Sequence, residues 1–216
     1  MKTPANRLSI PRPTVNRLPT YRRALENLLA SGRAVVSSHE LAAEVEVTPS
    51  QLRKDLSCFG TFGTAGVGYD VRDLVSRLDE ILGICKKRPV LLVGVGNLGL
   101  ALLNRRPIQR SGFEIVAACD TSPSKVGRVI AGVRCYSLEE TPAVLAAIKI
   151  SIAMLAVPPD TAQETADFLV KNGIRALVNF SPLRLRVDKG VLLEQVDFGY
   201  TLQKVAYYLD AMEEQQ

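Results

Sequence analysis

Residues 90–99 read Val90-Leu91-Leu92-Val93-Gly94-Val95-Gly96-Asn97-Leu98-Gly99, and they predict the fold of the C-terminal half. The four apolar residues at its start predict a short buried strand. The apolar residues 100–103 that follow the last glycine predict a helix. A G-x-G-x-x-G segment between a strand and a helix is the fingerprint of a dinucleotide-binding turn. We therefore expect this segment to hold the phosphates of a dinucleotide.

Each residue of this turn has a distinct expected role. Gly94 permits the tight turn, Gly96 lets the backbone approach a pyrophosphate, and Gly99 allows the helix to pack closely on the strand. Asn97 and Leu98 belong to the first helical turn, where free N–H groups and the positive end of the helix dipole favour phosphate. We therefore predict that all five residues bind the cofactor.

An acidic residue follows this turn at the expected distance. The predicted strand 115–119 ends in Asp120, which lies 21 residues after Gly99. A carboxylate at this point binds a ribose diol and repels a 2′-phosphate, which favours NAD(H) over NADP(H). Lys125 and Arg128 follow closely and weaken this preference. A CoA thioester or S-adenosylmethionine on a similar sheet is the alternative ligand.

Strands and helices continue to alternate after this point, which predicts a Rossmann domain with an open parallel sheet. We expect apolar strands at 150–157 and 174–179, with a helix at 161–172 between them. In such a sheet the ligand lies over the carboxyl ends of the strands, where Pro158 and Asn179 lie. Both residues are predicted to line the pocket, and a turn role without ligand contact is the alternative.

The N-terminal half has the pattern of three helices. Apolar residues at helical spacing run through 18–29, and Gly32 ends that helix. The segment 37–40 (Ser-Ser-His-Glu) has the spacing of a capping box, and 48–51 (Thr-Pro-Ser-Gln) marks a second helix start directly after it. Two short helices joined by a tight turn predict a helix-turn-helix.

The second short helix, residues 50–56, has the composition of a DNA-recognition helix. We expect Leu52 and Leu56 to pack inward, and the polar residues Gln51, Arg53, Lys54 and Asp55 to face outward. Arg and Lys read guanine edges in the major groove, and Gln reads adenine. The predicted DNA contacts are Ser50, Gln51, Arg53 and Lys54, with Arg12 from a flexible basic arm at residues 1–13.

Charge and glycine content support this reading. The chain has a net charge of +5, and all of the excess lies in residues 1–88, which hold 14 basic and 9 acidic residues. Such a one-sided distribution suits a polyanionic partner. The glycine-rich segment 60–69 predicts a β-hairpin, which would be the wing of a winged helix, and an ordinary turn is the alternative.

Several other classes of protein are disfavoured. The four cysteines have no C-x-x-C spacing and His39 is the one histidine, so we expect no metal site and no disulfide framework. No stretch approaches the roughly 20 apolar residues of a membrane span, and residues 1–4 do not resemble a signal peptide, so we expect a cytoplasmic protein.

An NAD-dependent dehydrogenase is the main rival function. It would need a proton donor near the nicotinamide. His39 lies in the predicted DNA-binding half, and Tyr200 and Lys204 lie on the terminal helix, away from the sheet. We therefore expect no enzyme. A CoA- or nucleotide-binding scaffold without DNA binding is the third alternative.

These motifs resemble the Rex family of redox-sensing transcriptional repressors, from Asn16 to the final helix. The resemblance rests on five segments, namely 36–38 (VSS), 53–60 (RKDLSCFG), 66–70 (GVGYD), 94–99 (GVGNLG) and 179–182 (NFSP). It implies an α/β protein with an N-terminal winged helix-turn-helix (1–84), a Rossmann NAD(H)-binding domain (85–199) and a C-terminal domain-swapped helix (200–216). It further implies a homodimer on an inverted-repeat DNA operator, which NADH releases and NAD⁺ does not.

The resemblance also implies a switch between the domains. Arg23 matches the family's arginine in the first helix, and Asp197 matches an aspartate near the C-terminus. Phe198 would approach the nicotinamide bound to the partner subunit. The chain departs from the family pattern at Arg105, where the family has its switch tyrosine, at Thr64-Ala65, where the wing commonly carries basic residues, and at Ser181, where alanine is usual.

Overall fold

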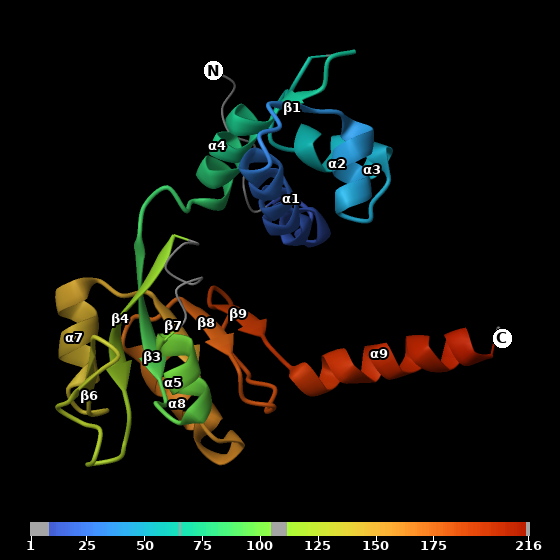
Figure 1. The fold of residues 1–216 in the computed structure, drawn as a ribbon. Helices are drawn as coiled ribbons and strands as arrows, with labels where there is room; N and C mark the ends of the chain where they lie inside the picture. The colour runs from blue at the N-terminus through green and yellow to red at the C-terminus, as the bar shows by residue number, and fades with distance from the viewer. Residues whose placement is uncertain (1–8, 65, 105–111, 215–216) are drawn as a thin grey trace. The chain divides into compact units, whose positions relative to one another are not determined.

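The computed structural model describes residues 9–64, 66–104 and 112–214, and the chain divides into two units, Met1–Lys86 and Lys87–Gln216 (Figure 1). The elements of the first unit are α1 (Arg12–Ala30), β1 (Val35–Val36), α2 (Ser38–Glu44), α3 (Pro49–Ser57), β2 (Tyr69–Asp70) and α4 (Val71–Leu82). Their apolar faces form one core. Its largest fully buried side chains are Leu18, Tyr21, Leu25, Leu41, Leu52, Leu56, Leu74 and Leu78.

The helix-turn-helix is formed by α2 and α3, and both helix starts have the expected caps. The hydroxyl of Ser37 accepts the Glu40 N–H, and the Glu40 carboxylate accepts the Ser37 N–H, which completes the capping box. The hydroxyl of Thr48 accepts the Gln51 N–H at 3.1 Å. These bonds satisfy backbone donors that a helix start otherwise leaves free.

Three expectations for this unit were wrong in detail. The basic arm is shorter than predicted, because α1 begins at Arg12; Pro13 fits the first helical turn, where its missing N–H costs nothing. Asp55 does not face outward but is fully buried. The segment 60–69 forms no extended hairpin within its described residues; it has one isolated bridge between Thr64 and Gly68, and then Tyr69 and Asp70 pair with β1.

The second unit contains a seven-stranded sheet in the order β5-β6-β4-β3-β7-β8-β9. The strands are β3 (Arg88–Val93), β4 (Phe113–Cys119), β5 (Val129–Ile130), β6 (Val133–Tyr136), β7 (Ile152–Leu155), β8 (Ala176–Asn179) and β9 (Leu192–Gln195). All neighbours pair in parallel except β5 and β6. The six parallel strands have the order of a classical Rossmann sheet, whose topological switch point lies between β3 and β7.

Helices cover both faces of this sheet, as a parallel sheet requires. They are α5 (Asn97–Leu103), α7 (Thr141–Ile148) and α8 (Pro159–Lys171). Leu91 and Val93 of β3 pack in one cluster with α7 and α8. Val90 and Leu92 pack in another cluster with α5. The central strand is therefore buried on both sides, which explains its uninterrupted apolar sequence.

The other strands and helices that were predicted for this unit lie close to their expected positions. The strand expected at 150–157 is shorter, since β7 ends at Leu155 and the next residues turn toward α8. The helix expected from residue 161 begins at Pro159, because Pro158 and Pro159 form its cap and first turn.

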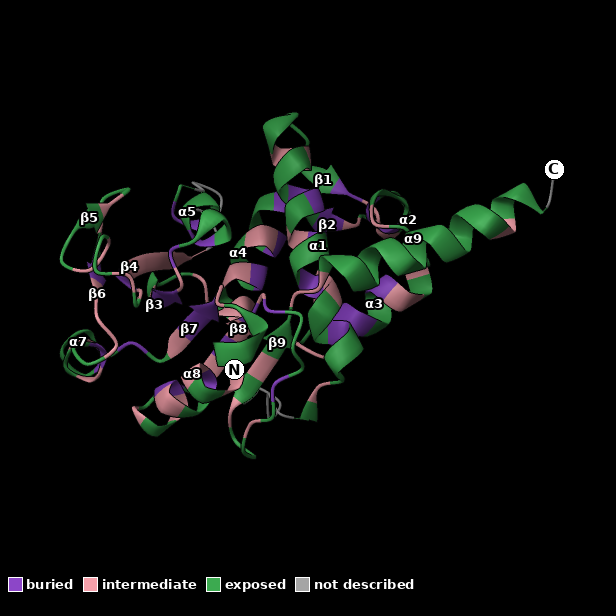
Figure 2. Ribbon diagram, turned by 90° about the horizontal axis from the view of Figure 1, so that it is seen from below, coloured by how far each residue is buried: buried purple, intermediate pink, exposed green. Residues whose placement is uncertain are grey.

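The last helix, α9 (Phe198–Glu213), has no buried residue, and Figure 2 shows it exposed along its length. Its apolar side chains are 53–69% exposed; they are Phe198, Tyr200, Leu202, Val205, Tyr207, Tyr208, Leu209 and Met212. A run of large apolar side chains this exposed is the mark of a surface that another protein surface covers.

Candidate functional site

The glycines between β3 and α5 have different structural demands. Gly94 has φ +89°, and a Cβ there would collide with the carbonyl oxygen of Ala156. A Cβ at Gly99 would collide with the carbonyl oxygen of Gly94. At Gly96 a Cβ would meet no atom within 4 Å. Gly94 and Gly99 are therefore needed by the fold, whereas Gly96 leaves open space at the N-terminus of α5.

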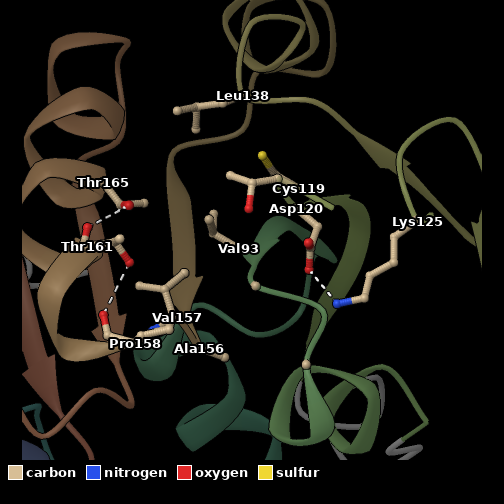
Figure 3. Close-up of a pocket in the computed structure, with 13 residues that line it drawn as sticks. Val93, Cys119, Asp120, Lys125, Leu138, Ala156, Val157, Pro158, Thr161 and Thr165 are labelled. Carbon is tan, nitrogen blue, oxygen red and sulfur yellow. Dashed lines mark hydrogen bonds and ion pairs between the residues drawn. The ribbon is translucent and has the colours of Figure 1, made fainter. Parts of the chain in front are cut away.

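A cavity of about 550 Å³ lies at the carboxyl ends of β3, β4 and β7 (Figure 3). Its walls are Val93, Gly94, Gly96, Cys119, Asp120, Thr121, Lys125, Leu138, Ala156, Val157, Pro158, Thr161 and Thr165. This is the position at which open α/β sheets bind ligands. The apolar and small residues of the wall can hold flat rings. The charged groups, Asp120 and Lys125, lie at one side of the cavity, and the hydroxyls of Thr161 and Thr165 lie across from them (Figure 3).

Asp120 is held by the turn that it faces. Its carboxylate accepts the backbone N–H of Val95 at 2.8 Å and that of Ser122 at 2.8 Å. Lys125 Nζ donates to Asp120 Oδ2 at 3.1 Å. Burial opposes the charged carboxylate, but the backbone hydrogen bonds and Lys125 outweigh it and lower the pKa of Asp120. A charged acceptor therefore lies beside the glycine turn at neutral pH.

The other predicted cofactor residues are distributed around different parts of the unit. Pro158 lines the cavity. Asn97 and Leu98 begin α5, directly after Gly96. Phe198 is 64% exposed at the start of α9 and lines a separate hollow. Its predicted contact would be with the cofactor of a partner subunit and stays a prediction.

Asn179 lies at the end of β8 and is fully buried. Its amide nitrogen donates to the carbonyl oxygens of Ser181 and Leu183 and to Oε1 of Gln195, at 2.8–3.1 Å. Its Oδ1 accepts the Ser181 N–H at 3.0 Å. Asn179 is outside the described wall of the cavity, and its polar atoms serve the turn after β8.

Our sequence reasoning missed two threonines that line the cavity from α8. Thr161 and Thr165 are four residues apart and lie on the face of α8 toward β7 (Figure 3). The signal was present, because the expected helix follows the strand at the switch point and residues four apart share a face.

The predicted DNA contacts lie on the first unit. Ser50, Arg53 and Lys54 are exposed on α3, and Arg12 is exposed at the start of α1. Arg53 Nη1 donates to Ser38 Oγ at 2.9 Å, which links the recognition helix to the start of α2. Gln51 is half-buried, and its amide points to Asp55 rather than back to the helix start.

The predicted switch residues are only partly described. Arg23 is exposed on α1. Asp197 caps α9, where its carboxylate accepts the Tyr200 N–H at 3.0 Å. Arg105 and Ala65 lie outside the described residues.

Two features are absent from the described residues. No helix in this part of the chain is long and apolar enough to cross a membrane. No group of three or more His, Cys, Asp or Glu side chains is placed to hold a metal ion there.

Comparisons with known proteins agree with both halves of this arrangement. Residues 9–57 match a family profile described as "Putative DNA-binding protein N-terminus", and residues 85–183 match one described as "CoA binding domain". A redox-sensing transcriptional repressor Rex of Pelotomaculum thermopropionicum is 42% identical over 208 residues, which are 96% of this chain and 98% of the relative. The Rex repressor of Roseiflexus sp. is 41% identical over 90% of this chain and 89% of its own.

Solved structures give the same result. A crystal structure of RSP in complex with β-NAD⁺ and operator DNA has a TM-score of 0.89 and 40% identity, and covers 94% of each chain. RSP in complex with β-NADH has a TM-score of 0.87 and 38% identity, covering 95% of this chain and 96% of that one. RSP is named as a Rex-family repressor. The resemblance and the two-domain α/β fold expected from the sequence are confirmed, and the chain belongs to the Rex family of redox-sensing transcriptional repressors.

Proposed function

We propose that this chain is a homodimeric transcriptional repressor that binds an inverted-repeat operator and leaves it when NADH occupies the cavity beside Asp120. One observation carries the proposal: a single chain joins an exposed basic recognition helix to a Rossmann cavity with a carboxylate at the ribose position. Related proteins have been crystallised with operator DNA and β-NAD⁺ and with β-NADH. A cytoplasmic location follows from this role.

The cavity fits a dinucleotide better than the alternatives. The open space at Gly96 admits a pyrophosphate next to the N–H groups of Asn97 and Leu98. Asp120 accepts three hydrogen bonds and has an acceptor position left for a ribose hydroxyl, whereas it would repel the phosphate that CoA and NADP(H) carry on the adenine ribose. Lys125 already pairs with Asp120, which reduces the positive charge left for such a phosphate.

The chain is a repressor rather than an enzyme. Its relatives over the whole length are named repressors. Among the described residues that line the cavity there is no histidine or tyrosine to act as the proton donor of a dehydrogenase. The Rossmann fold alone does not imply catalysis, because function depends on the groups in the site.

We propose that α9 is exchanged between two subunits, with domains at 1–84, 85–199 and 200–216. The support is the exposure of eight large apolar side chains on this helix. In the proposed dimer the cap residue Asp197 and its neighbour Phe198 would reach the partner's domains. Arg23 and Arg105 would complete the switch through which the cofactor site affects DNA binding.

The switch is proposed to work by differential affinity. A ligand shifts the balance of two dimer arrangements only as far as it binds one better than the other. NADH would have to favour the arrangement in which the two α3 helices no longer fit adjacent half-sites. NAD⁺ would have to leave the DNA-binding arrangement populated.

The test is fluorescence anisotropy of a labelled inverted-repeat duplex with the full chain, titrated separately with NADH, NAD⁺ and CoA. Release by NADH alone is the expected result. Tight DNA binding that responds to none of them would mean that DNA binding stands and the redox switch does not. Release by CoA would mean that the cavity binds CoA and not NADH.

A further inference from the structure

The buried carboxylate of Asp55 on the recognition helix is the centre of a side-chain network. Its side chain is 1% exposed. Thr14 Oγ1 donates to it at 2.9 Å, and Tyr21 Oη donates at 2.6 Å. Arg17 donates through Nε at 2.6 Å and Nη2 at 2.8 Å. Gln51 Nε2 completes the set at 2.8 Å.

These donors come from two sources with different consequences. Thr14, Arg17 and Tyr21 lie three and four residues apart on one face of α1, so they tie α3 to α1. Gln51 lies one turn before Asp55 on α3 itself. Asp55 therefore connects the position of α1 with the side chain of a recognition-helix residue.

The chemistry of the pair sets the orientation of the Gln51 amide. A carboxylate accepts hydrogen bonds only, so the amino group of Gln51 must face Asp55 and the carbonyl oxygen must face away. The amino group has two hydrogens, and one remains free. An adenine edge in the major groove is read by the carbonyl oxygen and one N–H of the same amide. The orientation that Asp55 imposes leaves both of these groups available.

A purely structural role explains the network less well. A buried ion pair is weak support for stability, since apolar residues of similar volume often replace it without loss. A single arginine would satisfy the charge of Asp55. The additional hydrogen bond from Gln51 does not strengthen the contact between α1 and α3, because Gln51 and Asp55 both lie on α3.

We propose that Asp55 is a positioning residue for operator recognition, which holds the Gln51 amide in the orientation that reads an adenine. The proposal rests on the proposed DNA-binding function. It adds a residue that touches no base and yet contributes to base discrimination, through Gln51.

The experiment uses the full-length chain and a duplex selected by it from a library of randomised inverted repeats. Dissociation constants are measured by anisotropy for the selected duplex and for each symmetric single-base-pair variant. The ratio of the two constants is the discrimination at that position. Four proteins are compared: the natural chain, Gln51→Ala, Asp55→Asn and the double variant.

We expect Gln51→Ala to lose about tenfold in discrimination at one A·T position, the size of one bidentate base contact. Asp55→Asn should lose most of the same ratio at the same position, because asparagine has one acceptor oxygen where the carboxylate has two. The double variant should lose no more than Gln51→Ala. Equal ratios for Asp55→Asn and the natural chain, or losses that multiply in the double variant, would overturn the proposal.

The control variant is Tyr21→Phe, which removes one hydrogen bond to Asp55 and leaves the Gln51 contact. It should lower the thermal stability and keep the discrimination unchanged. A loss of discrimination in Tyr21→Phe equal to that in Asp55→Asn would mean that general loosening of α3 explains both, and the proposal would fail.

A second measurement covers the case in which Asp55→Asn does not fold. In the NMR spectrum of the natural chain, the Gln51 side-chain amide proton that is donated to Asp55 should exchange slowly with water. Exchange as fast as that of a free glutamine amide would overturn the proposal. Failure of the selection to enrich any sequence, with no salt dependence of binding, would instead reject the DNA-binding function and the proposal with it.

Discussion

Among single residues, the buried Asp55 and the half-buried Asp120 keep their charge by different means. Asp55 is surrounded by side-chain donors from α1 and α3. Asp120 is held mainly by backbone N–H groups of two turns. In both cases the hydrogen bonds outweigh the cost of burial and lower the pKa. The first arrangement depends on tertiary contacts, and the second on the local course of the chain.

We predict that Asp120→Ala binds NADH about 10- to 100-fold more weakly, the usual effect of losing hydrogen bonds to a charged group. Affinity for NADPH should fall less, because the repulsion of its 2′-phosphate is removed as well. Isothermal titration calorimetry measures both. Asp160→Ala, an exposed aspartate of α8, is the control. Unchanged NADH affinity in Asp120→Ala would remove this residue from the site.

The stability of the first unit should depend on pH through Asp55. Burial opposes its charge, but hydrogen bonds from Arg17, Tyr21, Thr14 and Gln51 hold its pKa well below the ordinary 3.8. A lowered native pKa contributes stability that is present above the unfolded pKa and is lost as the pH falls through the native one.

Urea unfolding should therefore show the natural chain more stable than Asp55→Asn at pH 7, by about 3 kcal/mol for a broken buried pair. The difference should begin to shrink as the pH falls below about 4. A difference that stays constant from pH 7 to pH 3 would show that the charge of Asp55 is not its source.

The prediction that Asp55 faces solvent was wrong, and it shows a limit of assigning burial from the type of a single residue. A polar residue on an amphipathic helix is assigned to the solvent face by its type. The donors that make its burial favourable lie 34–41 residues earlier in the chain. No periodicity within 50–56 could reveal them, although Thr14, Arg17 and Tyr21 do share one helical face.

Among the elements, the turn between β3 and α5 contains one glycine that the fold requires, Gly94, and one that we expect the ligand to require, Gly96. We predict that Gly94→Ala destabilises the second unit by about 2 kcal/mol or more, because φ is positive and the new Cβ meets Ala156. Gly96→Ala should fold normally, since its φ of −76° and open surroundings accept a Cβ. It should nevertheless bind NADH at least about tenfold more weakly, because the methyl group fills the space for the pyrophosphate.

Thermal unfolding and NADH titration of the two variants distinguish these roles. Each variant serves as the other's control, because the substitution is identical and the positions are two residues apart. Normal NADH affinity in Gly96→Ala would contradict the assignment of this turn as the phosphate site.

The exposed apolar side chains of α9 lead to a prediction about the stability of the dimer. Leu202 and Leu209 lie two turns apart and are 67% and 53% exposed. Replacing both with Glu should raise the dimer dissociation constant by roughly a hundredfold or more, if each leucine is buried in the dimer. Sedimentation velocity measures this, and Glu213→Ala on the same helix is the control. A dimer of undiminished stability would place the interface elsewhere.

The wing shows how element prediction fails for short, glycine-rich segments. The described glycines Gly60, Gly63, Gly66 and Gly68 all have positive φ, which repeated strand geometry does not allow. A Cβ at Gly68 would lie 2.5 Å from the carbonyl oxygen of Val36, so the close approach to β1 requires glycine. Composition indicated a turn-rich segment correctly, but the pairing of Tyr69 with Val36 depends on a strand 33 residues earlier.

At the scale of the whole molecule, the two units have separate cores and separate proposed ligands. We predict that Arg53→Ala and Lys54→Ala each weaken operator binding about tenfold, the value of one base contact or several phosphate contacts. NADH affinity should stay unchanged, because neither residue belongs to the unit that contains the cavity. Lys171→Ala, a basic residue of α8, is the control.

Anisotropy with labelled operator and NADH fluorescence would be measured on the same protein samples. If operator affinity and NADH affinity both fell in Arg53→Ala or Lys54→Ala, DNA binding and NADH binding could not be assigned to separate units. Loss of operator binding in Lys171→Ala would mean that net charge, rather than the recognition helix, governs the interaction.

Local sequence patterns were enough to predict the two-domain fold, the dinucleotide turn, the acidic residue after β4 and the helix-turn-helix. These features are local: apolar periodicity, capping residues and glycine spacing act over at most about 20–30 residues. Tertiary contacts were needed to show that Asp55 is buried, that the amide of Asn179 serves a turn, and that no other part of the described chain buries the apolar side chains of α9. Burial and side-chain partners arise when distant segments meet, and neither is encoded in the local pattern of either segment.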